Sequence, residues 1–302
     1  MTHPGAAAAL LVNAFVFGLS WWPFRQLEAW GLHPLWATAL MYVCSMACLL
    51  LVRPGAWRGL LAHPALWLLV GASGMTNVGF NWAITVGDVV RVVLLFYLMP
   101  AWSVLLAWWL LGEKPTPGAL LRLTLALVGV AIVLKAPDTP WPVPQALPDW
   151  LALMGGFFFA MTNVLLRKLE STPEDSRVLA MFLGGACMAA TVAWLGQGQG
   201  MVSALPAAEW HWLALAGAMS LVFLAANFAL QYGASRLSAH STALIMLSEV
   251  VFASASSVWF GVAQLGARTL FGGALILLAA ALSAWPARAL PLTAPGPQSP
   301  HP

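Results

Sequence analysis

The sequence predicts an all-α integral membrane protein with ten transmembrane helices, arranged as two inverted five-helix repeats. Three observations lead to this fold class. First, 61% of the 302 residues are hydrophobic and only 8% are charged, whereas about a quarter of an ordinary soluble domain is charged. Second, the mean hydropathy is +0.84, and apolar runs recur at about the 20-residue length that crosses a bilayer. Third, the two halves of the chain share matched positions.

Ten apolar segments are long enough to cross a hydrocarbon core. Turn-forming stretches such as Arg53-Pro54-Gly55 separate them. The first cation is Arg25, so no positively charged region precedes the first apolar run, and we interpret that run as a span rather than a cleaved signal peptide. The predicted spans cover residues 6–26, 34–52, 65–85, 89–110, 117–135, 150–168, 178–196, 212–232, 238–260 and 269–286.

The distribution of cations predicts that both termini are cytoplasmic. Lys and Arg accumulate in short cytoplasmic loops, and ten spans place both termini on one side. With the N-terminus inside, nine cations lie in inner loops, namely Arg53, Arg58, Lys114, Arg122, Arg167, Lys168, Arg177, Arg236 and Arg288. Four remain outside, namely Arg25, Arg91, Lys135 and Arg268. This balance favours cytoplasmic N- and C-termini, and the expected location is the cell (inner) membrane, which the chain crosses several times.

Two alignments of the chain with itself predict an internal repeat. A shift of 142 residues places Arg25-Gln26-Leu27-Glu28 beside Arg167-Lys168-Leu169-Glu170. A shift of 146 residues matches Gly71, Asn81-Trp82-Ala83 and Gly87 with Gly217, Asn227-Phe228-Ala229 and Gly233. The expected organisation is a first repeat over 1–136, an extracytoplasmic Pro-rich linker over 137–149, a second repeat over 150–286, and a disordered cytoplasmic tail over 287–302.

A repeat of five spans crosses the membrane an odd number of times, so its second copy enters from the opposite face. Two inverted halves are typical of secondary transporters, whose substrate site lies near the midplane and opens to each side in turn. The sequence therefore favours alternating access through a central cavity.

The chain resembles the ten-helix EamA-type exporters of the drug/metabolite transporter superfamily from about residue 6 to 286. The segments that carry the resemblance are Phe15–Trp22, Tyr97-Leu98-Met99-Pro100-Ala101, Leu111-Gly112-Glu113, Leu127-Val128-Gly129-Val130, Leu247-Ser248-Glu249-Val250, Phe260-Gly261 and Gly272-Gly273-Ala274-Leu275. Two positions depart from the family pattern: Val250 replaces the usual proline, and Val262 replaces the acid after Gly261. The many tryptophans and the first and fourth spans look most like the amino-acid exporter branch, including exporters of aromatic amino acids.

Glu249 is the one acid placed centrally in a predicted span. An ionised side chain at the centre of a membrane helix costs about 2.5–3.5 kcal/mol, so it should face a partner or an aqueous cavity. It could bind a substrate ammonium or carry a proton. The alternative is a structural carboxyl that is hydrogen-bonded to neighbours such as Ser248.

Amide side chains offer both donors and an acceptor, which suits a zwitterionic substrate. Asn77 and Asn163 are predicted to face the cavity, whereas Asn81 and Asn227 fit the cavity and interhelical hydrogen bonding equally well. Aromatic rings in the first and fourth spans could form a sandwich for an aromatic or long side chain and offer π faces to an ammonium. These are Trp21, Trp22, Tyr97 and Trp102; core packing is the alternative for each.

Pro23 and Pro100 interrupt apolar helices and are predicted hinges. Arg25 with Glu28, and Asp88 with Arg91, lie at i, i+3 spacing near the outer ends of spans and are predicted to form ion pairs. Arg91 is also a candidate for gating an outward-facing cavity.

Several other functions lack the residues that they require. The formal Gly-x-Ser-Gly at Gly71–Gly74 has no histidine at membrane depth to act as its base. Walker A and His-Glu-x-x-His motifs do not occur. Three cysteines form no disulfide framework, and the predicted protein has neither metal nor cofactor. Thinly spread charge excludes a nucleic-acid partner.

The sequence therefore predicts a secondary transporter, not an enzyme, that exports amino acids or related small metabolites. Its expected partners are a small-molecule substrate and the lipid bilayer, and a monomer is compatible with the sequence. Facilitated diffusion and proton antiport both fit. The alternatives are export of other metabolites or drugs by the same superfamily, a membrane scaffold, or an intramembrane enzyme.

Overall fold

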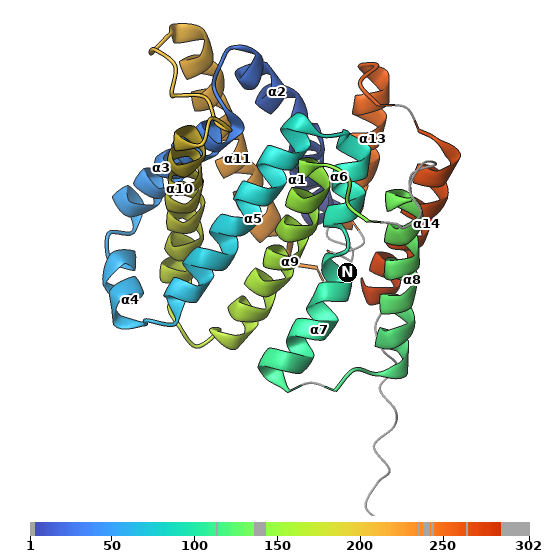
Figure 1. The fold of residues 1–302 in the computed structure, drawn as a ribbon. Coiled ribbons are helices and arrows are strands. Elements are labelled where there is room, and N and C mark those ends of the chain that lie inside the picture. Colours follow the sequence, from blue (N-terminus) through green and yellow to red (C-terminus); the bar gives the residue numbers. More distant parts are fainter. Residues whose placement is uncertain are drawn as a thin grey trace, which may run out of the picture.

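The computed structural model describes residues 4–112, 114–135, 143–234, 236–237, 242, 245–263 and 265–284. Within these residues the elements are helices joined by short loops (Figure 1). The helices up to residue 135 are α1 (Pro4–Leu19), α2 (Trp21–Ala29), α3 (Pro34–Val52), α4 (Ala56–Ala62), α5 (Leu66–Val86), α6 (Val89–Phe96), α7 (Met99–Leu111) and α8 (Pro117–Leu134). Those that follow are α9 (Leu147–Lys168), α10 (Glu174–Gly198), α11 (Trp210–Ala234), α13 (Ser248–Trp259) and α14 (Ala267–Ala284).

Helix ends follow local capping signals. Asp88 and Thr116 cap α6 and α8 by accepting hydrogen bonds from the backbone N–H groups of Arg91 and Ala119. His33 caps α3 in the same way, because its Nδ1 accepts from the N–H of Leu35 at 3.2 Å. Gly112 ends α7 in the left-handed conformation with φ +72°, which a residue without a Cβ adopts at low cost.

Seven helical segments of the described chain are long and apolar enough to cross a membrane, or up to eight if one bent pair forms a single span. The bent pair is α4 with α5, at 110°, and α4 is a helix that the sequence analysis did not anticipate. The predicted all-α multi-pass membrane protein is confirmed. The helices in the last two predicted spans are shorter than these seven segments. α13 has 12 residues, and the apolar part of α14 is Ala267–Leu282. The tail over 287–302 and linker residues 137–142 lie outside the described part.

Two predicted spans are broken into consecutive helices. The first divides into α1 and α2 at Ser20, and the fourth divides into α6 and α7 at Tyr97-Leu98. Pro23 and Pro100 each lie in the first turn of the helix that follows a break, where a missing backbone N–H costs little.

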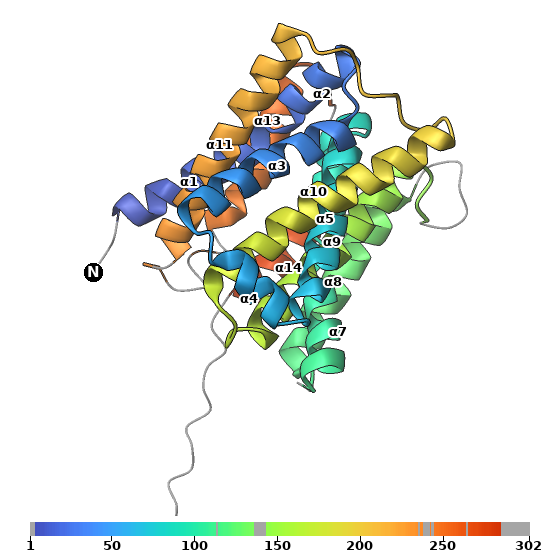
Figure 2. The ribbon, with the colours of Figure 1, turned by 90° about the vertical axis from the view of Figure 1, so that its left-hand side faces the viewer.

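The helices before and after residue 140 interleave. α5 packs against α9 and α10, while α11 packs against α1 and α3; Figure 2 shows α1, α3 and α11 together on one side. α6 and α7 contact α9, and α13 contacts α1. α8 and α14 pack against each other and lie side by side at one edge in Figure 1.

Glycines allow the closest of these contacts. A Cβ added to Gly129 of α8 would lie 2.7 Å from the carbonyl oxygen of Gly272, and a Cβ added to Gly272 of α14 would lie 2.7 Å from the carbonyl oxygen of Gly129. Both distances are too short for any other residue, so the two backbones touch through a reciprocal contact.

Candidate functional site

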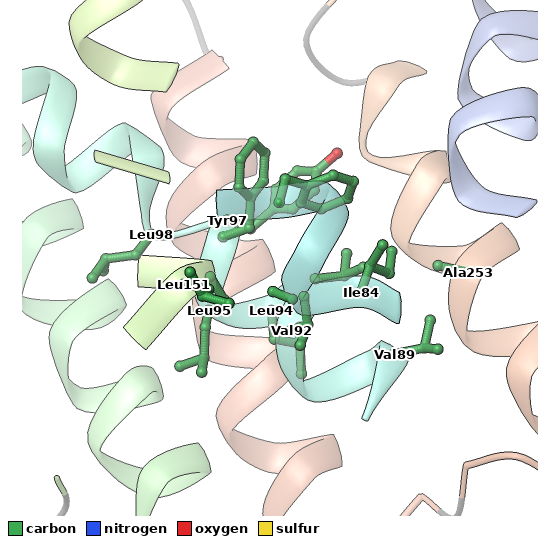
Figure 3. Close-up of a cluster of buried hydrophobic side chains, with 14 of the residues drawn as sticks. Ile84, Val89, Val92, Leu94, Leu95, Tyr97, Leu98, Leu151 and Ala253 are labelled. Carbon is green, nitrogen blue, oxygen red and sulfur yellow. The ribbon is translucent and has the colours of Figure 1, made fainter. Parts of the chain in front are cut away.

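The break in the fourth span positions Tyr97 between the two halves. Its side chain is buried among apolar residues at the end of α6 (Figure 3). The Tyr97 hydroxyl lies 3.2 Å from the carbonyl oxygen of Met246 and 3.3 Å from Oε2 of Glu249, and it donates toward these two acceptors. The break in one half is therefore hydrogen-bonded to the start of α13 in the other.

Glu249 lies in the first turn of α13, where the N-terminal half contacts it closely. A Cβ on Gly18 of α1 would lie 2.8 Å from the Glu249 carbonyl oxygen. Trp21 donates from Nε1 to Oγ of Ser256 at 3.0 Å. Ser248, which the sequence offered as a neighbour for the carboxyl, donates instead to the carbonyl of Ile245 at 2.7 Å. The carboxylate thus has its hydrogen-bond partner in the other half of the chain.

The four predicted aromatic residues do not form one sandwich in the described structure. Trp21 is buried and meets Phe260 edge-on at 5.8 Å, whereas Trp22 is 46% exposed and stacks against the same ring at 6.4 Å. Trp102 packs edge-on against Phe157 of α9 at 5.6 Å, and its indole Nε1 is buried without a hydrogen-bond partner. Trp21, Trp22 and Trp102 thus each contact an aromatic ring of the C-terminal half, and such ring pairs stabilise helix contacts.

Asn77 and Asn81 of α5 are hydrogen-bonded to side chains of α3. Asn77 Oδ1 accepts from the Tyr42 hydroxyl at 2.6 Å, and Asn81 Nδ2 donates to Oγ1 of Thr38 at 3.0 Å. Asn77 also donates to the carbonyl of Ser73 one turn earlier. In this conformation both amides join helices within the N-terminal half, which is the interhelical alternative.

The other two predicted amides lie apart from this group. Asn163 is exposed on the surface of α9, since the buried face of that helix carries its neighbours Thr162 and Val164. Asn227 is half-buried and donates to the carbonyl of Phe223, one turn earlier in α11.

Arg91 forms an ion pair across the two halves. Its Nε and Nη2 donate to the two carboxylate oxygens of Asp149 on α9, at 2.7 and 2.8 Å, and Nη1 donates to the carbonyl of Val133 at 2.8 Å. The predicted pair with Asp88 is wrong, because the Asp88 carboxylate accepts from the backbone N–H of Arg91 as the α6 cap. A carboxylate on another helix gives the planar guanidinium two parallel hydrogen bonds, which a residue three positions earlier cannot offer.

The second predicted ion pair is also wrong. Arg25 and Glu28, both in the described part, form no ion pair; Arg25 donates to the carbonyls of Thr85 and Gly87 at the end of α5. The last carbonyls of a helix carry partial negative charge and attract cations. The guanidinium also lies 5.4 Å from the centre of the Trp21 ring.

No group of three metal-ligating side chains occurs among the described residues. The site that the geometry offers therefore consists of polar contacts between helices of two halves.

The chain matches the EamA-like transporter family over residues 4–135 and again over residues 146–285. The chain belongs to the EamA-like transporter family. This EamA-like chain is a multi-pass membrane protein.

Two known proteins are similar to the chain. The EamA-like chain is 28% identical over 182 residues to the "Uncharacterized transporter PA0485" of Pseudomonas aeruginosa, a match over 54% of this chain and 57% of that protein. A solved crystal structure overlays with a TM-score of 0.57 at 18% identity, and the overlay covers 93% of this chain and 97% of that one. The latter supports the fold alone.

Sequence reasoning missed two residues of this arrangement in the EamA-like chain, Asp149 and Ser256. Asp149 is the last residue before the sixth predicted span, and a lone acid at a helix start is usually explained by the positive N-terminal end of the helix. Ser256 is one of several small polar residues in α13. The signal that could have identified Asp149 was its position at the same predicted membrane face as the cation Arg91.

Proposed function

We propose that the protein is a secondary transporter that exports amino acids, including aromatic ones, or related small metabolites across the inner membrane. The substrate moves by alternating access between an N-terminal half over 1–136 and an inverted C-terminal half over 150–286, with both termini in the cytoplasm. The observation that carries the proposal is the contact of Tyr97 with Glu249, which joins a helix break of one half to the carboxylate of the other.

The helix pairing supports two inverted halves. The third predicted span packs against the sixth and seventh (α5 with α9 and α10), and the eighth packs against the first and second (α11 with α1 and α3). If the first five spans are exchanged with the last five, the contacts of the third span become those of the eighth and the reverse. A two-fold axis in the membrane plane requires this correspondence. The fifth and tenth spans, α8 and α14, pair with each other across that axis.

Polar groups in membrane helices are retained where they face partners or substrate. In the proposed cycle, Glu249 exchanges its hydrogen bond from Tyr97 for the ammonium of the substrate when α13 moves relative to α6. Pro23 and Pro100 lie beside the two breaks and act as hinges. The Arg91–Asp149 ion pair holds α6 against α9 and forms part of the outer gate.

Counterflow in liposomes tests this function. Purified protein is reconstituted with unlabelled amino acids inside, and labelled tryptophan, methionine or threonine is supplied outside at two pH values. Uptake should require a matching internal amino acid. An imposed pH gradient should leave uptake unchanged if the protein is a facilitator, and should stimulate it if Glu249 couples proton movement. The absence of uptake for every amino acid in the panel would contradict amino-acid export and direct the search to other metabolites and drugs.

A further inference from the structure

Arg122 is a cation within the apolar helix α8 that lacks a counter-charge. Its Nη1 donates to the carbonyl of Leu282 on α14 at 3.5 Å, the long limit of a hydrogen bond. Its Nε is buried and has no hydrogen-bond partner. Among the described residues, no carboxylate lies within ion-pair distance of Arg122. A guanidinium carries five N–H donors, and the carbonyl of Leu282 is the one acceptor that Arg122 contacts among the described residues.

The same arginine lines a narrow crevice between α7, α8 and α14. Tyr97 and Pro100 lie on its α7 side, and the remaining walls are apolar, with Ala126 and Ile276 on facing helices. Tyr97 is one of the lining residues of this crevice, and its hydroxyl lies 3.3 Å from Glu249 Oε2. Tyr97 therefore lies both beside the crevice and beside the Glu249 carboxylate.

In this conformation the crevice has no room for a water molecule. A ligand enters only if α14 moves away from α7, and these two helices share a small contact. Such a movement belongs to a transport cycle in which the halves shift relative to each other. The crevice then widens next to a guanidinium in a low-dielectric setting, where an anion is attracted strongly.

We propose that Arg122 binds the carboxylate group of the transported substrate, so that the substrate class is a zwitterionic amino acid held between Arg122 and Glu249. This inference rests on the proposed export function and adds the group that recognises the acid end. Arginine is suited to this task because its planar fork matches both oxygens of a carboxylate. The apolar walls of the crevice suit the hydrocarbon part of the ligand.

Substrate selectivity gives the first test. Counterflow of labelled tryptophan is compared with that of labelled tryptophanamide, which keeps the indole and ammonium but lacks the carboxylate. A charge-assisted hydrogen-bonded pair corresponds to about a tenfold or larger change in affinity. We therefore expect Arg122→Gln to reduce tryptophan uptake by about tenfold or more, and to change tryptophanamide uptake by less than about twofold.

Two further variants control this test. Arg58→Gln removes an exposed cation of α4 and should leave both uptake rates unchanged. Arg122→Lys keeps the charge without the fork and should retain part of the preference for tryptophan, which also covers the case in which Arg122→Gln does not fold. Equal effects of Arg122→Gln on tryptophan and tryptophanamide would overturn the proposal.

A binding measurement separates this inference from the export function. The thermal midpoint of the detergent-solubilised protein is recorded with indole-3-propionate and with its neutral amide. Only the carboxylate should raise the midpoint, and Arg122→Gln should abolish the rise while Arg58→Gln preserves it.

An Arg122-dependent rise in a protein that exchanges no amino acid would refute amino-acid export but support the carboxylate site. Amino-acid exchange with unchanged selectivity in Arg122→Gln would support amino-acid export but refute the carboxylate site at Arg122. A rise caused by phosphatidylglycerol and not by the carboxylate would assign Arg122 to a lipid headgroup and overturn the proposal.

Discussion

Arg91 and Asp149 are joined by two parallel hydrogen bonds of 2.7 and 2.8 Å between helices α6 and α9. The carboxylate side chain is 5% exposed, and the guanidinium side chain is 28% exposed. Removing one member of such a buried pair leaves the other charge uncompensated, which is more costly than replacing both. The pair spans the two halves, so its loss affects both stability and gating.

We expect Asp149→Asn to lower the free energy of unfolding by about 3 kcal/mol, measured by thermal unfolding in detergent. The double variant Arg91→Gln/Asp149→Asn should recover part of this loss, because no unpaired charge then remains. If the double variant is as unstable as the two single changes combined, the two residues do not act as a pair.

Tyr97→Phe removes the hydroxyl that donates toward Met246 and Glu249. We expect a loss of about 1 kcal/mol in stability together with a reduced rate of counterflow, because Glu249 loses its partner. Tyr42→Phe is the matched control: it removes the 2.6 Å hydrogen bond to Asn77 within the N-terminal half. A transport defect of equal size in the control would argue against a special role for Tyr97.

Gly129→Ala tests the contact between α8 and α14. The added Cβ would lie 2.7 Å from the Gly272 carbonyl oxygen, and we expect a loss of about 1–3 kcal/mol from overpacking. Gly71→Ala adds a methyl group where no atom lies within 4 Å, so it should be neutral or stabilise the helix by up to about 1 kcal/mol. Thermal unfolding of both variants gives the comparison, and equal midpoints would contradict the tight contact.

His33 predicts how stability depends on pH. Burial lowers the pKa of His33 from 6.5 to about 4, and its Nδ1 must stay unprotonated to accept from Leu35. A histidine whose folded pKa is depressed stabilises the fold fully above its unfolded pKa and loses this contribution as the pH falls through the folded value. Thermal midpoints should therefore drop between about pH 6.5 and 4. In His33→Ser, which keeps a capping hydroxyl, the drop should be smaller; an identical pH profile would assign the effect to other groups.

The positions of the helices could be predicted from hydropathy and turn residues. The span expected over 34–52 is α3, with the same bounds, because Pro34 and Pro54 mark its ends in the sequence. The breaks at Ser20 and Tyr97 lie just before the predicted hinge prolines. Local signals therefore determined most element boundaries.

The partners of polar side chains could not be predicted in this way. The i, i+3 spacing suggested Asp88 for Arg91, whereas the carboxylate that binds it lies 58 positions along the chain. The rotation of a helix about its axis decides which of its side chains are buried, and hydropathy does not determine this rotation in a largely apolar helix such as α9. The helix α4 was missed because its seven residues are too few for a periodic pattern.

The reciprocal contact of Gly129 and Gly272 has a consequence for the ancestry of the chain. Each glycine contacts the carbonyl oxygen of the other, as equivalent residues do at the two-fold axis of a homodimer. In the proposed arrangement, a gene encoding five helices would have produced subunits that inserted in both orientations and associated as antiparallel pairs before the gene was duplicated and fused. Residues 1–136 and 137–302 expressed as separate polypeptides should therefore still assemble in one membrane.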